Sequence, residues 1–163
     1  GVHRKPMIDF SQMIDESRIV DLKATTKEEA LGELVDVLAT SPNVTDPDDL
    51  LRAILEREKV LSTGVGIEVA MPHVKIPSVK NFVIAIGRSH KGIDFESLDE
   101  KPVYIIVMIG ANDKQAGDFL KVLAKLVLRL KNKTFRKQVM FAKSPKRIKE
   151  LFVSEDLPEE DDE

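Results

Sequence analysis

The sequence predicts an α/β fold: a single-domain sandwich in which helices cover both faces of a mixed β-sheet. Segments with helical spacing alternate with segments rich in Val and Ile along the 163 residues. Residues 103–109 are apolar at almost every position, which is typical of a central strand that is buried on both faces. The chain is long enough for one well-buried core and short for two.

The first half of the chain is expected to contain one short strand followed by two helices. Residues 19–22 form a short apolar run, which indicates a strand. Thr26 and Glu29 have the spacing of a capping box, and apolar residues at helical spacing follow them. Asp46 can cap a second helix, and Pro47 suits the first position of that helix.

The second half is expected to hold two longer strands and three helices. The strands are predicted at residues 82–87 and 102–109, because both segments are rich in Val and Ile, and residues 92–95 can add a short one. The helices are predicted at residues 114–130, 133–141 and 145–152.

The formal net charge of -3 is distributed unevenly. Residues 119–149 include eleven Lys or Arg and no acidic residue, whereas seven of the last nine residues are acidic. We expect residues 1–153 to form one domain and residues 154–163 to be a disordered acidic tail. The basic stretch can bind nucleic acid or an acidic partner, or it can be the solvated side of the last helices. Without a set of stacking aromatic residues we favour the solvated helices and expect no nucleic-acid partner.

Several classes of site are excluded or left without support by composition. The chain has no cysteine, so it has no disulfide, thiolate metal site or cysteine nucleophile. Its histidines, His3, His73 and His90, lack zinc-ligand spacing. The sequence also lacks the Gly-Lys-Ser/Thr of a Walker loop and the Gly-x-Ser-x-Gly nucleophile motif of hydrolases. We therefore expect no metal and no cofactor. Without a signal peptide or an apolar stretch that could cross a bilayer, we expect a cytoplasmic protein with no membrane insertion.

Residues 62–75, between a predicted helix and a predicted strand, bring together the residue types that phosphoryl transfer to histidine requires. His73 carries the one side chain whose ordinary pKa lets it act as a neutral nucleophile near pH 7. The hydroxyls of Ser62 and Thr63 and the amides of Gly64 and Gly66 can donate to phosphoryl oxygens. The segment is therefore a candidate phosphoryl-binding site.

Two more residues, one before this segment and one within it, suit the same chemistry. Arg57, near the end of the second predicted helix, can supply a bidentate guanidinium. Pro72 fixes its own φ and restricts the direction in which His73 leaves the backbone. A histidine beside proline is also common as a structural loop residue, and two glycines occur in plain turns. The residues alone leave both interpretations open.

The motif Ser62-Thr63-Gly64-Val65-Gly66, continued by Val69-Ala70-Met71-Pro72-His73, resembles the active-site segment of bacterial phosphotransferase-system enzyme IIA domains. The similarity is to type 2, the fructose/mannitol class that includes the nitrogen-regulatory members, and it covers nearly the whole chain. It implies that the histidine-containing phosphocarrier protein phosphorylates His73. It also implies that Arg57 is the active-site arginine and Thr63 the hydroxyl beside the phosphoryl group.

Two positions depart from the pattern of this family. Many members carry a second histidine at the start of the long helix, where this chain has Phe119. Phenylalanine neither donates nor accepts a hydrogen bond. Members also commonly have glycine where this chain has Glu68, whose carboxylate would repel a phosphoryl group if it pointed inward. Both residues are expected at the rim of the site.

The resemblance implies a phosphoryl carrier, a phosphotransferase component rather than a free-standing multiple-turnover enzyme. The sequence shows no attached enzyme IIB cysteine and no membrane segment, which favours a nitrogen-type regulatory output read by partner proteins. One alternative is a separate IIA subunit of a fructose/mannitol-type sugar transport complex, which passes the group to enzyme IIB. Another is a regulatory binding module on the same fold that is never phosphorylated. The sequence predicts neither the sugar nor the oligomeric state.

Overall fold

A computed structural model describes residues 8–60 and 67–160 and confirms the α/β fold, with a mixed five-stranded sheet covered by five α-helices in this part of the chain. A short 3₁₀ helix, η1 (Phe10–Gln12), precedes the sheet. The strands are β1 (Ile14–Asp21), β2 (Val69–Ala70), β3 (His73–Lys75), β4 (Val83–Ile93) and β5 (Val103–Ala111). The helices are α1 (Lys27–Leu38), α2 (Pro47–Val60), α3 (Ala116–Leu130), α4 (Lys133–Phe141) and α5 (Pro145–Val153).

The strands are arranged in the order β1-β4-β5-β2, and β3 also pairs with β5. β4 and β5 are antiparallel, whereas β1 is parallel to β4, and β2 and β3 are parallel to β5. β2 and β3 therefore follow one another along the same side of β5, at an edge of the sheet.

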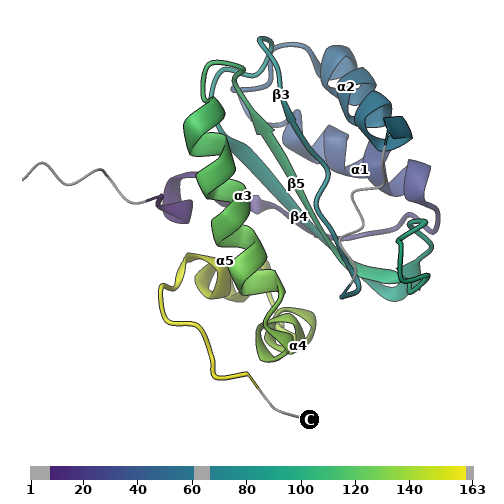
Figure 1. Ribbon diagram of the computed structural model, residues 1–163, viewed down its shortest axis with the longest axis vertical. Coiled ribbons are helices and arrows are strands. Elements are labelled where there is room, and N and C mark those ends of the chain that lie inside the picture. Colours follow the sequence, from purple (N-terminus) through teal and green to yellow (C-terminus); the bar gives the residue numbers. More distant parts are fainter. Residues whose placement is uncertain (1–7, 61–66, 161–163) are drawn as a thin grey trace, which may run out of the picture.

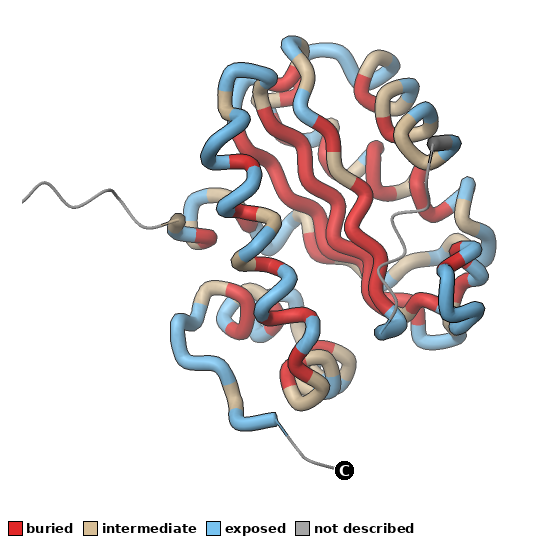
Figure 2. Tube along the Cα trace, viewed as in Figure 1, coloured by how far each residue is buried: buried red, intermediate tan, exposed pale blue. Residues whose placement is uncertain are grey.

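Two hydrophobic cores lie on opposite faces of the sheet. α1 and α2 cover one face, and α3, α4 and α5 cover the other (Figure 1). Along β5, Ile105, Val107 and Ile109 contribute to the core under α3, whereas Ile106 and Met108 contribute to the core under α1 and α2. Figure 2 shows the result, in which the central strands are buried and the outer sides of the helices are exposed. This explains why the sequence of β5 is apolar at almost every position.

The predicted starts of α1 and α2 are confirmed by their caps, whereas α3 begins at Ala116, two residues after its predicted start. The Thr26 hydroxyl accepts from the amide of Glu29 at 3.3 Å, and it donates to the Glu29 carboxylate at 2.8 Å. The Asp46 carboxylate accepts from the amide of Asp49 at 3.1 Å in the first turn of α2. Each cap satisfies an amide that has no partner within its helix.

Three features of the sheet were not predicted. β4 runs from Val83 to Ile93, beyond the predicted end at residue 87, and it includes part of the 92–95 segment that was expected as a separate short strand. β1 begins at Ile14, five residues before the predicted start, because residues 15–18 are polar and the edge position of β1 leaves them largely in water. β2 and β3 were not predicted as strands, since each spans only two or three residues and Pro72 lies between them. Proline is tolerated there because an edge strand has one side without a neighbour.

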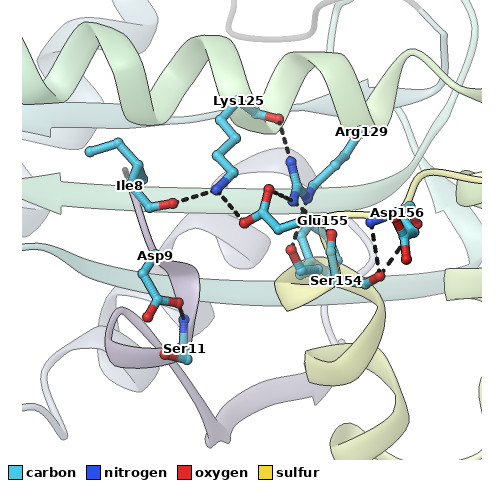
Figure 3. Close-up of polar contacts among 9 residues, drawn as sticks. Ile8, Asp9, Ser11, Lys125, Arg129, Ser154, Glu155 and Asp156 are labelled. Atoms are coloured by element: carbon cyan, nitrogen blue, oxygen red, sulfur yellow. Dashed lines mark hydrogen bonds and ion pairs between the residues drawn. The ribbon is translucent and has the colours of Figure 1, made fainter. Parts of the chain in front are cut away.

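The segment after α5 continues across α3 and α4 through charged and polar contacts (Figure 3). The Glu155 carboxylate accepts from Lys125 at 2.7 Å, and the same lysine donates to the carbonyl of Ile8. This bond to Lys125 lowers the pKa of Glu155. Arg129 donates to the carbonyl of Ser154 at 2.8 Å. Within the described residues, no helix has the length and apolar character needed to cross a membrane.

Arg88 joins the sheet to the end of α4. Its side chain is only 8% exposed and pairs with Asp21 of β1 at 2.8 Å. Its guanidinium also donates to the carbonyls of Val139, Met140 and Ala142 at 3.0, 3.2 and 2.7 Å. One arginine therefore donates to three carbonyls at the end of α4, of which that of Val139 also accepts from the amide of Ala142 at 3.4 Å.

Replacing Arg88 by alanine is expected to lower the free energy of unfolding by about 2–4 kcal/mol, because buried carbonyls lose their charged donor. Urea denaturation measures the loss. Arg52→Ala is the matched control, since Arg52 is 63% exposed and its ion pair with Asp49 is worth less than about 1 kcal/mol. Equal losses for the two variants would contradict the role assigned to Arg88.

Candidate phosphoryl-transfer site

Three of the residues singled out by the sequence line one hollow of ≈ 450 Å³ between α2, β3 and the start of α3. They are Arg57 from α2, His73 from β3 and Phe119 from α3. The described residues that line it are Ala53, Glu56, Arg57, His73, Val74, Lys75, Ile76 and Phe119. Residues more than 60 positions apart in the chain therefore meet at one place.

The backbone of His73 is fixed by pairing with the central strand. His73 lies opposite Ile109 in the parallel ladder, with the same offset that places Val69 opposite Ile105. Between the two short strands, the amide of Ile109 donates to the carbonyl of Pro72 at 2.9 Å, so the pairing continues through the proline. The histidine is thus held at the edge of a rigid sheet rather than on a free loop.

The imidazole ring is oriented by a backbone carbonyl. Nδ1 of His73 lies 2.6 Å from the carbonyl oxygen of Met71. Because a carbonyl only accepts, Nδ1 must carry a proton and donate it. In the neutral ring the lone pair then lies on Nε2, which makes Nε2 the nucleophilic atom.

The surroundings keep this ring neutral near pH 7. Burial lowers the pKa of His73 below its ordinary value, and the charge of Arg57 acts in the same direction. The hydrogen bond to Met71 and the charge of Glu58 raise the pKa without cancelling the effect of burial. A lowered pKa leaves the Nε2 lone pair available for attack on phosphorus.

Phe119 packs close to the imidazole. The two ring centroids are 5.8 Å apart and the rings are tilted by 49°. The phenylalanine is only 5% exposed and lies in the first turn of α3. It forms an apolar wall of the hollow and offers no proton to a phosphoryl group.

Glu68 does not line the hollow that contains His73. It lines a second hollow of ≈ 670 Å³, together with Tyr104 and residues of α4. Its φ is 65° and that of Ile67 is 51°, which places two consecutive non-glycine residues in the left-handed region. Such residues store backbone strain of about 1–3 kcal/mol each. Glu68 therefore has a positive φ where other members commonly have glycine, and its side chain lines another part of the surface.

Four of the expected phosphoryl-binding residues, Ser62, Thr63, Gly64 and Gly66, lie outside the described residues. Sequence reasoning missed two features of the site itself. The carbonyl of Met71 could not be found from residue types, since every residue has a carbonyl. Lys75 could have been found from the alternation of a strand, because it is two residues after His73 and lines the same hollow.

Comparison with known proteins identifies the family of this chain. The model of the family described as "Phosphoenolpyruvate-dependent sugar phosphotransferase system, EIIA 2" matches residues 12–155. The chain is 36% identical over 137 residues to the fructose-specific EIIABC component of Bacillus subtilis (strain 168), which covers 84% of this chain and only 22% of that protein. It is 34% identical over 128 residues to the fructose-specific EIIA component of Haloferax volcanii, covering 78% of this chain and 83% of that protein.

A solved structure gives the same result for the fold. The crystal structure of nitrogen regulatory protein IIA-Ntr from Neisseria meningitidis matches with a TM-score of 0.83 at 27% identity. The match covers 88% of this chain and 98% of that one.

The pKa of His73 should respond to the charge of Arg57. In wild type, the ring is expected to titrate below about 6.5, and Arg57→Gln should raise the midpoint, because a neighbouring cation disfavours the imidazolium. NMR titration of the ring carbons measures both midpoints. The same shift predicts that the free energy of unfolding falls as the pH drops from about 6.5 through the folded midpoint.

Lys146→Gln, an exposed change on α5, is the control and should leave the midpoint of His73 where it is. A lower midpoint in Arg57→Gln than in wild type would contradict the electrostatic account.

Proposed function

Because this chain belongs to the enzyme IIA type 2 family of phosphoryl carriers in the phosphoenolpyruvate-dependent sugar phosphotransferase system, we propose that it carries its phosphoryl group on Nε2 of His73. One observation carries the assignment. His73 lines a hollow beside Arg57, and the Met71 carbonyl holds the proton of the ring on Nδ1 at 2.6 Å.

The proposed step needs no proton transfer by this chain. The Nε2 lone pair attacks phosphorus, and the bond between phosphorus and the donor nitrogen breaks with its electron pair returning to the donor. The phosphoryl group moves, while the proton stays on Nδ1 and remains hydrogen-bonded to the Met71 carbonyl. The neutral ring therefore becomes an N-phosphorylated imidazolium on transfer, which makes it a good leaving group for the next transfer.

Positive charge and backbone donors stabilise the transition state in this proposal. Charge is spread over the equatorial oxygens of the transferring group, so preorganised donors at those oxygens accelerate the step. Arg57 supplies a guanidinium at the wall of the hollow. We assign the remaining donors to the hydroxyls of Ser62 and Thr63 and to the amides of Gly64 and Gly66.

We propose the histidine-containing phosphocarrier protein as donor, in the cytoplasm, where that system operates. The proposed output is regulatory, and the similarity to the nitrogen regulatory protein of Neisseria meningitidis supports it. The fructose-specific relatives favour a second candidate, a IIA subunit that passes the group to enzyme IIB. Incubating the phosphorylated protein with a fructose-type IIB domain separates the two, since only a transport subunit passes the group to the IIB cysteine rapidly.

Intact-mass measurement tests the carrier function directly. With phosphoenolpyruvate, enzyme I and the phosphocarrier protein, the wild type should gain one phosphoryl group and His73→Ala none. His90→Ala is the matched control, because His90 is an exposed histidine away from the hollow, and it should behave as wild type. No mass gain in wild type, with partners proven active on another acceptor, would leave only a binding module that is never phosphorylated.

Arg57→Ala is expected to slow phosphorylation by roughly 10²-fold, because a charge-assisted bidentate contact to the transition state is lost. Rapid-quench kinetics measure the rate. Arg57→Lys keeps the positive charge but loses the planar, bidentate guanidinium, so its rate should lie between those of wild type and Arg57→Ala. A wild-type rate in Arg57→Ala would show that this side chain does not touch the transferring group.

A further inference from the structure

Lys75 shares the exposed face of β3 with His73. Successive side chains of a strand alternate between its two faces, so residues two apart point the same way. Val74, between them, is 8% exposed and packs into the core under α1 and α2. His73 and Lys75 point the other way, and both line the hollow with Arg57.

The backbone under Lys75 is as firmly held as that under His73. Lys75 pairs with Ala111 of β5, and the next amide, that of Ile76, donates to the carbonyl of Ala111 at 2.9 Å. Two residues along a strand span about 6.5–7 Å, and the flexible four-carbon stem of lysine covers such a distance. The ammonium can therefore reach oxygens of a group bonded to Nε2 of His73.

The ammonium group of Lys75 forms no ion pair in the part of the chain that the structure describes. Lys75 is exposed, and no ion pair to it occurs within residues 8–60 and 67–160. Among the described residues, the charged side chains that line the hollow are the cations Arg57 and Lys75 and the anion Glu56. A dianionic phosphoryl group would meet both cations and be repelled by the carboxylate.

We propose that Lys75 is a second phosphoryl-binding residue, which contacts the group carried on His73. This role rests on the proposed function, to which it adds one binding residue and the direction in which each charge acts. Lys75 stabilises the phosphorylated state and its formation, and Glu56 opposes both. In this arrangement the planar guanidinium of Arg57 orients the phosphoryl group, whereas Lys75 supplies a mobile point charge.

A small chemical donor separates this role from the docking of a protein partner. Phosphoramidate phosphorylates histidine without any protein surface, so its rate reports on the hollow alone. We expect Lys75→Gln to slow this reaction by about 3–10-fold, as for loss of one partly exposed charge contact. Lys75→Arg should keep most of the rate, and Glu56→Gln should raise it. Lys146→Gln, an exposed lysine that lines none of these hollows, is the control and should match wild type.

The phosphorylated proteins supply a readout that a structural role would not move. In a ³¹P NMR titration, the midpoint of the phosphoryl group should rise in Lys75→Gln and fall in Glu56→Gln, because a nearby cation favours the dianion. Unchanged phosphoramidate rates and ³¹P midpoints in Lys75→Gln would overturn the inference. Slowing with the protein donor alone would overturn it too, since Lys75 would then be a docking residue. Failure of the wild type to accept a phosphoryl group from either donor would instead contradict the proposed function.

Discussion

The site depends on the main-chain pairing of residues 68–76 with the central strand β5. The bonds run from the carbonyl of Glu68, which accepts from Tyr104, to the amide of Ile76, which donates to Ala111. Both faces of β5 are covered by hydrophobic core, so its position is set by the packing of the whole domain. His73 inherits that rigidity at a sheet edge, where its other side stays open to a partner. A histidine on a mobile loop would not be held at a fixed place relative to Arg57.

A second consequence of this pairing is the charge state of His73. Holding the chain through Pro72 brings the carbonyl of Met71 to 2.6 Å from Nδ1. The same carbonyl would favour an imidazolium, which could not act as a nucleophile. Burial of the ring, together with the charge of Arg57, outweighs that preference and lowers the pKa. The tautomer and the neutral charge are thus set by two different features, one a hydrogen bond and the other desolvation.

Much of the fold and part of the candidate site could be predicted from the sequence. The central strand and the helix starts were predictable, because apolar runs and capping residues act locally. His73, Arg57 and Phe119 were identified as site residues, and they meet at one hollow. The strands on either side of Pro72 were not predictable, since pairing of two or three residues is decided by the partner strand and not by local propensity. Glu68 was expected at the rim, but the direction of its side chain follows from backbone torsions that residue types do not encode.

In the proposed mechanism, the Met71 carbonyl makes Nε2 of His73 the atom that carries the phosphoryl group. Long-range ¹H–¹⁵N correlation spectra of the phosphorylated protein identify the substituted ring nitrogen directly. The structure predicts phosphorus on Nε2, with Nδ1 still protonated and hydrogen-bonded. Phosphorus on Nδ1 would contradict the account, because the bond to Met71 would then have to break before transfer.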